Sequence, residues 1–366
     1  MYILTVIPLS KGIQKDELTY FSAKEIEVGS IVRVPMRSKT IDAIVINKEN
    51  ANERKSELKN ASYELKKIES SKGKPPYKES FFKACEKMAQ YSGATTGSVI
   101  SALLPAVLIE KFSELKHKNI ELGSERPSVK EERLIFQALL PDRLSWYRTL
   151  IREAFAKKES VFICVPTRYD IDQYYEAFSK GIDQYVFKFN SEITKKNLIA
   201  DFNKVVAEEH PILIIGTGPF LCIPRHDVRT IIVEHESSSA YKQISRPFID
   251  MRTLAETIAH VDHIKLIYGD TLLRPETLHR HDIGELGEIA SPLFRLPQVE
   301  RQIIIDMKEE LDEKGMHSFK VLSETTKKMI AYALTHKETV FLFTLRKGLA
   351  GVTVCHDCGH TMLCKY

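Results

Sequence analysis

The chain has no glycine between Gly123 and Gly181, although it contains 16 glycines in 366 residues. The sequence Gly-Lys-Ser/Thr is absent from the whole chain. A phosphate-binding loop needs glycines because its backbone N–H groups must turn inwards to contact the phosphates. It also needs a lysine and a hydroxyl side chain for the terminal phosphates and Mg²⁺. These absences exclude a Walker-A type nucleotide site.

Other features are scarce as well. No run of about 18 or more apolar residues exists, and the N-terminus MYILTVIPLSKG lacks a basic leader, so we expect no membrane partner and a cytoplasmic location. The 53 Lys and Arg against 49 Asp and Glu leave a net charge of only +4, so any nucleic-acid binding must come from local basic patches. Six cysteines, three of them between positions 355 and 364, fit a reducing compartment and a metal site better than disulfides.

The chain is long enough for two or three globular domains, and its 43% apolar content is typical of them. The first predicted domain is 1–110. Short alternating segments over 2–9, 29–36 and 40–47 predict strands of a small β-rich domain, and helical patterns follow over 81–92 and 98–109. The polar, lysine-rich stretch 47–77 is interpreted as an exposed loop, with nucleic-acid contact as a secondary alternative.

The pattern changes after a charged linker at 111–128. From 129 to 315, amphipathic helices alternate with largely apolar runs, which are 161–166, 185–189, 212–217, 230–235 and 264–269. This alternation predicts a doubly wound parallel sheet whose strands are buried on both faces. Residues 316–366 form a third, incomplete region with a helix over 323–336, a strand over 339–344 and then the cysteines.

Several phrases agree, in order along the chain, with one bacterial protein family. They are Val6-Ile7-Pro8-Leu9, Tyr20, Val28-Gly29-Ser30, Val32-Arg33-Val34-Pro35, Ile44-Val45, 91–105, Val165-Pro166, Gly216-Thr217, Tyr241-Lys242-Gln243 and 345–364. The chain resembles the primosomal protein N′ (PriA) family of replication-restart helicases. The resemblance implies an α/β fold with three parts: a 3′-end DNA-binding domain, a RecA-like sheet equivalent to lobe 1 of a superfamily 2 helicase, and the start of lobe 2.

The departures from the family concern its nucleotide site. The family's phosphate loop aligns with 140–144, where only Arg143 keeps a positive charge and Asp142 would place a negative charge against the phosphates. Glu234 takes the position of the Walker-B aspartate, and Glu236 follows two residues later on what we expect to be the same side of the strand. Without the loop we do not expect ATP or Mg²⁺ to bind at these degenerate positions. The alternative for the two glutamates is a solvated strand end.

The small domain carries the predicted DNA contacts. In the family it captures the 3′ end of a DNA strand, but here the sequence Leu18-Thr19-Tyr20 lacks the aspartate that would contact the terminal sugar. Arg33, Arg37 and Lys39 remain as phosphate contacts, with Tyr20 as a stacking surface. The alternative is a charged hairpin that is merely solvated.

The C-terminal cysteines have the spacing of zinc ligands. Cys355 and Cys358 are three residues apart, and Cys364 follows. The family uses eight cysteines for two zinc ions, so three make an incomplete site, which His356 or His360 would have to complete. The alternative is a tail with free thiols.

Three functions follow from these observations. The first is a DNA-binding protein of replication restart, acting at forked or single-stranded DNA with a 3′ end, without helicase activity in this chain and with other replication proteins as partners. The second is an ATP-dependent 3′-to-5′ helicase, which the missing Walker A opposes. The third is a protein-interaction scaffold that has lost both DNA and ATP.

Overall fold

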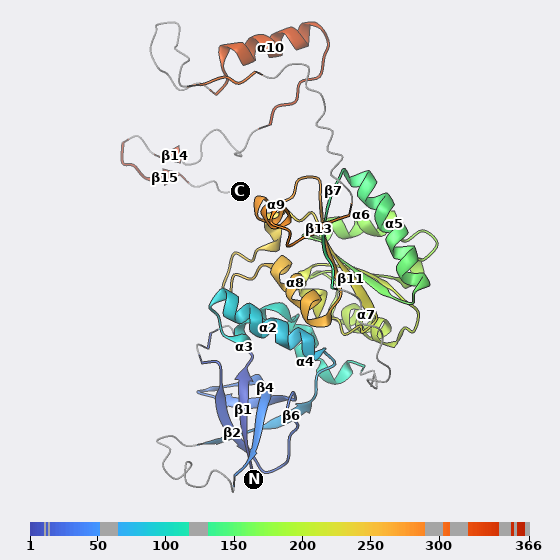
Figure 1. Cartoon of the computed structure of the whole chain (residues 1–366). Coiled ribbons are helices and arrows are strands. Elements are labelled where there is room, and N and C mark those ends of the chain that lie inside the picture. Colours follow the sequence, from blue (N-terminus) through green and yellow to red (C-terminus); the bar gives the residue numbers. More distant parts are fainter. Residues whose placement is uncertain are drawn as a thin grey trace. The chain divides into compact units, whose positions relative to one another are not determined.

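The computed structural model describes residues 1–10, 12–13, 15–51, 65–116, 131–289, 303–307, 321–343, 353–354 and 357–362. The chain divides into two compact units, Met1–Phe294 and Arg295–Tyr366. The first unit contains a small N-terminal sheet, a layer of short helices and a seven-stranded parallel sheet (Figure 1).

The small sheet has six strands in the order β5-β2-β1-β4-β3-β6. They are β1 (Tyr2–Pro8), β2 (Leu18–Ser22), β3 (Ile31–Met36), β4 (Lys39–Asn50), β5 (Lys66–Lys67) and β6 (Ser70–Gly73). The strands predicted over 2–9, 29–36 and 40–47 are confirmed as β1, β3 and β4, whereas β2 was not predicted. The alternation of apolar and polar residues identified the three because one side of each faces a core.

One short segment closes this sheet on itself. β5 pairs with β2 at one edge, and β6 pairs with β3 at the other. Between them the Ile68 N–H donates to the Phe21 carbonyl at 3.0 Å, and the Glu69 N–H donates to the Arg33 carbonyl at 3.0 Å. The loop predicted over 47–77 is wrong at both ends, and its residues 52–64 lie outside the described part of the chain. At one end β4 continues to Asn50, and at the other β5 and β6 pair with the open edges of β2 and β3.

A layer of helices follows the small sheet. It consists of α2 (Glu79–Ser92), α3 (Thr96–Leu103), α4 (Ala106–Glu110) and the 3-10 turn η1 (Phe112–Glu114). α2 ends at Gly93, whose φ of 61° fits the left-handed C-terminal cap. The helix predicted over 98–109 is split in two, because Pro105 cannot continue α3.

All seven strands of the large sheet are parallel, in the order β13-β7-β12-β11-β8-β10-β9. They are β7 (Arg133–Gln137), β8 (Ser160–Cys164), β9 (Val186–Phe189), β10 (Leu213–Gly216), β11 (Val228–Glu234), β12 (Lys265–Asp270) and β13 (Gly287–Glu288). The connecting segments are α5 (Leu140–Ala156), α6 (Arg168–Phe178), η2 (Asp183–Tyr185), α7 (Lys195–Ala207), η3 (Gly218–Cys222), η4 (Ser239–Tyr241), α8 (Met251–Asp262) and α9 (Pro275–Asp282). The predicted α/β fold with a doubly wound parallel sheet is confirmed.

The sheet has a hydrophobic core on each face. Ile232 of β11 packs into the core that contains the buried residues of α5 and α6, whereas Ile231 and Val233 pack into the core that contains those of α7 and α8. Burial on both faces explains why these strands are continuous apolar runs in the sequence.

In the second unit, α10 (Glu324–Thr335) confirms the helix predicted over 323–336, and β14 (Thr353–Val354) pairs with β15 (Thr361–Met362). The strand predicted over 339–344 is not formed at 339–343, where the backbone has no regular secondary structure. An apolar run becomes a strand only beside a partner, and the described residues offer it none. None of the helices that the structure describes combines the length and apolar character needed to cross a lipid bilayer.

Candidate functional site

The connection between β7 and α5 lies at the position predicted for the degenerate nucleotide site. Only Ala138 and Leu139 separate the two elements, so the backbone has no loop that could curl around a phosphate. Positions 140–144 form the first turn of α5, which has Pro141 at its start. This start of the helix directs Arg143 inwards, where it is fully buried.

Arg143 forms a buried ion pair with Glu234, the last residue of β11. Its Nε donates to Glu234 Oε1 at 2.7 Å, and its Nη2 lies 2.6 Å from the same oxygen. Both side chains are 0% exposed. The guanidinium also donates through Nη1 to the Ala138 carbonyl and, at 3.0 Å, to the Thr271 hydroxyl. The two positions aligned with Walker A and Walker B are therefore bonded directly to each other.

Two tyrosine hydroxyls also donate hydrogen bonds to the Glu234 carboxylate. Tyr147 of α5 donates to Glu234 Oε2 at 2.6 Å, and Tyr174 of α6 donates to Oε1 at 2.6 Å. Burial and the adjacent carboxylate raise the pKa of both tyrosines, so both remain protonated donors at neutral pH. Burial disfavours a charged guanidinium, but Glu234 outweighs it and the pKa of Arg143 is raised. We call Arg143, Tyr147, Tyr174 and Glu234 the buried cluster.

Gly269 of β12 makes room for the buried cluster. A Cβ atom at this position would overlap the Tyr147 hydroxyl and the Glu234 carboxylate. Glycine is thus required here by close approach, although its backbone conformation is ordinary for a strand.

Glu236 does not share a site with Glu234. β11 ends at Glu234, and His235 adopts a left-handed φ of 52°, which turns the chain. Glu236 accepts hydrogen bonds from the Arg274 N–H at 3.0 Å, from Arg274 Nε at 2.5 Å and from the Thr277 hydroxyl at 2.7 Å, and it is 0% exposed. The prediction that both glutamates face the same side is wrong, because the strand does not extend to Glu236.

The buried cluster has the chemistry of a structural site. Every carboxylate oxygen in it already accepts from a cation or a hydroxyl, and none faces solvent. Within the described ranges, no three His, Cys, Asp or Glu side chains come together as a group that could hold a metal ion. The alternative of a solvated strand end is also wrong, because both glutamates are buried.

The predicted DNA contacts lie on the β3–β4 hairpin. Arg33, Arg37 and Lys39 are exposed. None of these three side chains has a hydrogen-bond or ion-pair partner among the residues that the structure describes. Tyr20, in contrast, is only 6% exposed and donates its hydroxyl to the Pro35 carbonyl at 3.1 Å. Its ring belongs to the core of the small sheet and has no exposed face on which a base could stack.

Two further lysines lie at the same end of the small sheet. In β5, Lys66 pairs with Tyr20 and Lys67 with Phe21 of β2, and the Tyr20 hydroxyl reaches the Pro35 carbonyl of β3. Both lysines are exposed. We call Arg33, Arg37, Lys39, Lys66 and Lys67 the basic end. The sequence did not single out Lys66 and Lys67, because they lie in a stretch where glutamates are interspersed with lysines.

The structure describes only one of the three predicted zinc ligands. Cys358 is an exposed free cysteine, and Cys355 and Cys364 lie outside the described residues.

Comparisons with known proteins bear on both sites. A family model described as a 3′DNA-binding domain (3′BD) of PriA matches residues 6–105. Replication restart protein PriA of Rickettsia conorii is 24% identical over 368 residues, which cover 93% of this chain and 53% of that protein. PriA of Rickettsia prowazekii is 24% identical over 387 residues, covering 99% and 56%. The solved structure of the UvsW helicase from bacteriophage T4 covers 43% of this chain and 53% of its own, with 13% identity and a TM-score of 0.31.

The chain spans about half the length of the curated relatives that it matches. The match to the N-terminal domain covers the small sheet from residue 6 onward, including the basic end, and the matches to the relatives cover nearly all of this chain. The chain is thus similar to PriA proteins over nearly its whole length, at 24% identity, and its residues 6–105 match their 3′DNA-binding domain.

Proposed function

We propose that this chain is a DNA-binding protein of replication restart that holds forked or single-stranded DNA with a free 3′ end at its basic end. The observation that carries the proposal is the exposure of five basic side chains on the small sheet, within the stretch that matches the 3′DNA-binding domain. Phosphates attract such exposed cations without base specificity.

The conformation of Arg37 supports a role in binding. Arg37 and Ser38 form the two-residue turn between β3 and β4, and Arg37 has a φ of 53°. Such positions favour glycine or asparagine, and a residue with a larger side chain costs about 1 kcal/mol there. A strained arginine at an exposed turn is consistent with a contact that needs its charge.

We also propose that this chain holds DNA without hydrolysing ATP. The support is the buried cluster, in which Arg143 and Glu234 bond to each other at the positions that would have to contact the phosphates and Mg²⁺. Opening this cluster for a nucleotide would expose a buried charge pair and break five hydrogen bonds of the carboxylate and the guanidinium. The helicase alternative is disfavoured for this reason.

The test is fluorescence anisotropy with a labelled forked DNA that has a free 3′ end, titrated with salt. We expect log Kd to rise with log salt, and we expect the variant Lys66→Ala/Lys67→Ala to bind more weakly and to lose roughly 0.7 in slope for each contact. The matched control is Lys157→Ala/Lys180→Ala, which removes two exposed lysines in the turns after α5 and α6 and should leave both quantities unchanged. A slope near zero for the unaltered chain would refute DNA binding.

A protein-interaction role is the second candidate. Five large apolar side chains are exposed after the carboxyl ends of neighbouring strands β7, β12, β11 and β8; they are Leu139, Leu272, Ile244, Phe248 and Tyr169. Ile244 is 97% exposed. Large exposed apolar side chains are typical of surfaces that bind another protein, which would here be a second replication protein. A salt slope near zero in the anisotropy experiment would favour this candidate over the first.

For the C-terminal cysteines we propose an incomplete zinc site. Thiolates from Cys355, Cys358 and Cys364 supply three of the four ligands that a structural zinc needs. The chain by itself should therefore hold zinc weakly.

A further inference from the structure

The helices α2, α3 and α4 lie between the two sheets and pack against both. Toward the small sheet they bury Ile31 and Ile44, which point outward from β3 and β4. α3 approaches β1 so closely that a Cβ at Gly97 would overlap the Pro8 carbonyl. On this side the helices therefore pack directly against the small sheet.

The other side of the same helices belongs to the core of the parallel sheet. α2 packs along α8, and α3 packs against η3. The buried residues of α2 and α8 fall in one continuous hydrophobic cluster, which includes Phe81, Ala84, Met88, Leu254 and Ile258. Ile31 and Ile44 of the small sheet lie in that same cluster, so a single core runs from one sheet to the other.

Polar contacts lie at the edge of this shared core. Lys78, at the start of α2, pairs with Asp262, at the end of α8, at 2.8 Å, and the two side chains are only 15% and 16% exposed. On the side of α7, Asn203 accepts from the Lys116 N–H at 2.7 Å and donates to the Glu114 carbonyl at 2.8 Å. These bonds join the helical layer to two different helices of the large sheet.

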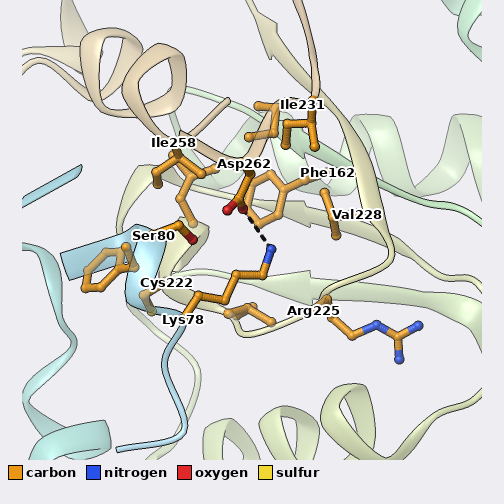
Figure 2. Close-up of a pocket in the computed structure, with 13 residues that line it drawn as sticks. Lys78, Ser80, Phe162, Cys222, Arg225, Val228, Ile231, Ile258 and Asp262 are labelled. Atoms are coloured by element: carbon orange, nitrogen blue, oxygen red, sulfur yellow. Dashed lines mark hydrogen bonds and ion pairs between the residues drawn. The ribbon is translucent and has the colours of Figure 1, made fainter. Parts of the chain in front are cut away.

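The space left at this interface is small. Figure 2 shows the cavity beside the Lys78–Asp262 pair, with Cys222, Phe162 and Ile258 among its walls. Its volume of about 20 Å³ has room for one water molecule. The guanidinium of Arg225 points away from the cavity and is bonded to Asp227 and to backbone carbonyls. The cavity is thus a packing defect of a close interface.

We infer that the small sheet and the parallel sheet open and unfold as one cooperative body, with α2–α4 as their common layer. Domains of one chain move against each other by default unless their interface is large and hydrophobic, and this interface is a continuous core. DNA held at the basic end would keep a fixed orientation relative to the parallel sheet. The inference itself does not depend on DNA binding.

The test is native-state hydrogen exchange of the full chain, without DNA. The variant Val34→Ala opens a cavity in the core of the small sheet, where Val34 is 0% exposed and lies outside the shared cluster. If the two sheets unfold together, the amide hydrogens of β11 and of β4 should both exchange faster in this variant. The two sets should accelerate by the same factor, on the order of tenfold. Acceleration confined to β1–β6 would overturn the inference.

A reciprocal variant covers the case in which Val34→Ala does not fold. Ile232→Val removes one methylene from the far face of the parallel sheet, where Ile232 is 0% exposed. Amides of β4 should again accelerate by the same factor as those of β11, here a few-fold. The control Val28→Ala changes a residue that is 46% exposed and should leave both sets of amides unchanged. A response of β11 without β4 would contradict cooperativity.

Discussion

Replacing Arg143 by methionine removes the cation of the buried cluster and keeps most of the side-chain volume. The Glu234 carboxylate then stays buried with two tyrosine donors and no counter-charge. The Ala138 carbonyl and the Thr271 hydroxyl also lose their donor. We therefore expect a large loss of stability from this single change.

The magnitude follows from the burial of both partners. Breaking a fully buried ion pair by removing one side costs about 3–5 kcal/mol, because the remaining charge has no compensation. Whole domains are stable by only about 5–15 kcal/mol, so Arg143→Met should unfold at a much lower denaturant concentration. Adding Glu234→Gln removes the orphaned charge, so the double variant should be more stable than Arg143→Met alone.

The assay is urea unfolding followed by far-UV circular dichroism, extrapolated linearly to water. The matched control is Arg152→Met, an exposed arginine on the same helix, which should change stability by about 0.5 kcal/mol or less. If Arg143→Met cost less than about 1 kcal/mol, the typical value for a surface pair, the reasoning from a buried pair would be refuted.

Three further expectations concern the same structure. Gly269→Ala should destabilise the chain by about 1–3 kcal/mol, because the new methyl group overlaps the buried cluster. The control Gly12→Ala adds a methyl group in open space and should not destabilise the chain. Equal urea midpoints for the two variants would contradict this expectation. Burial raises the folded-state pKa of four tyrosines above their ordinary value of 10.0; they are Tyr77, Tyr147, Tyr241 and Tyr268. The stability that they contribute is therefore intact below pH 10 and is lost as the pH rises further. The loss is up to about 1.4 kcal/mol per pH unit for each tyrosine. Urea midpoints that stay constant from about pH 9 to about pH 11 would oppose that expectation. Purified chain should contain less than one equivalent of zinc, removable by a weak chelator, and one tightly held zinc ion that Cys358→Ser abolishes would show that the site is complete.

The parallel sheet could be predicted because its strands are buried on both faces and their apolar runs stand out in the sequence. β5 and β6 could not, because Lys66–Gly73 becomes a strand only when it meets edges that come from Leu18–Ser22 and Ile31–Met36, far away in the chain. Local composition contains no information about such an edge.

The candidate site shows the same limit. The missing glycines are the basis for expecting no phosphate loop, which stays a prediction. Nothing local relates the register of α5 to the end of β11, so the pairing of Arg143 with Glu234 could not be foreseen. One signal was present: Tyr147 lies four residues after Arg143, on the same helix face. Glu236 was misplaced because the left-handed turn at His235 has no glycine to mark it.

The most direct test of DNA binding without ATP turnover is an ATPase assay on the chain saturated with 3′-ended forked DNA. We predict phosphate release no faster than in the protein-free control, because Arg143 and Glu234 are bonded to each other and the β7–α5 connection has only two residues. Phosphate release that rises with DNA concentration would contradict this, since it would require the buried cluster to open and bind a nucleotide.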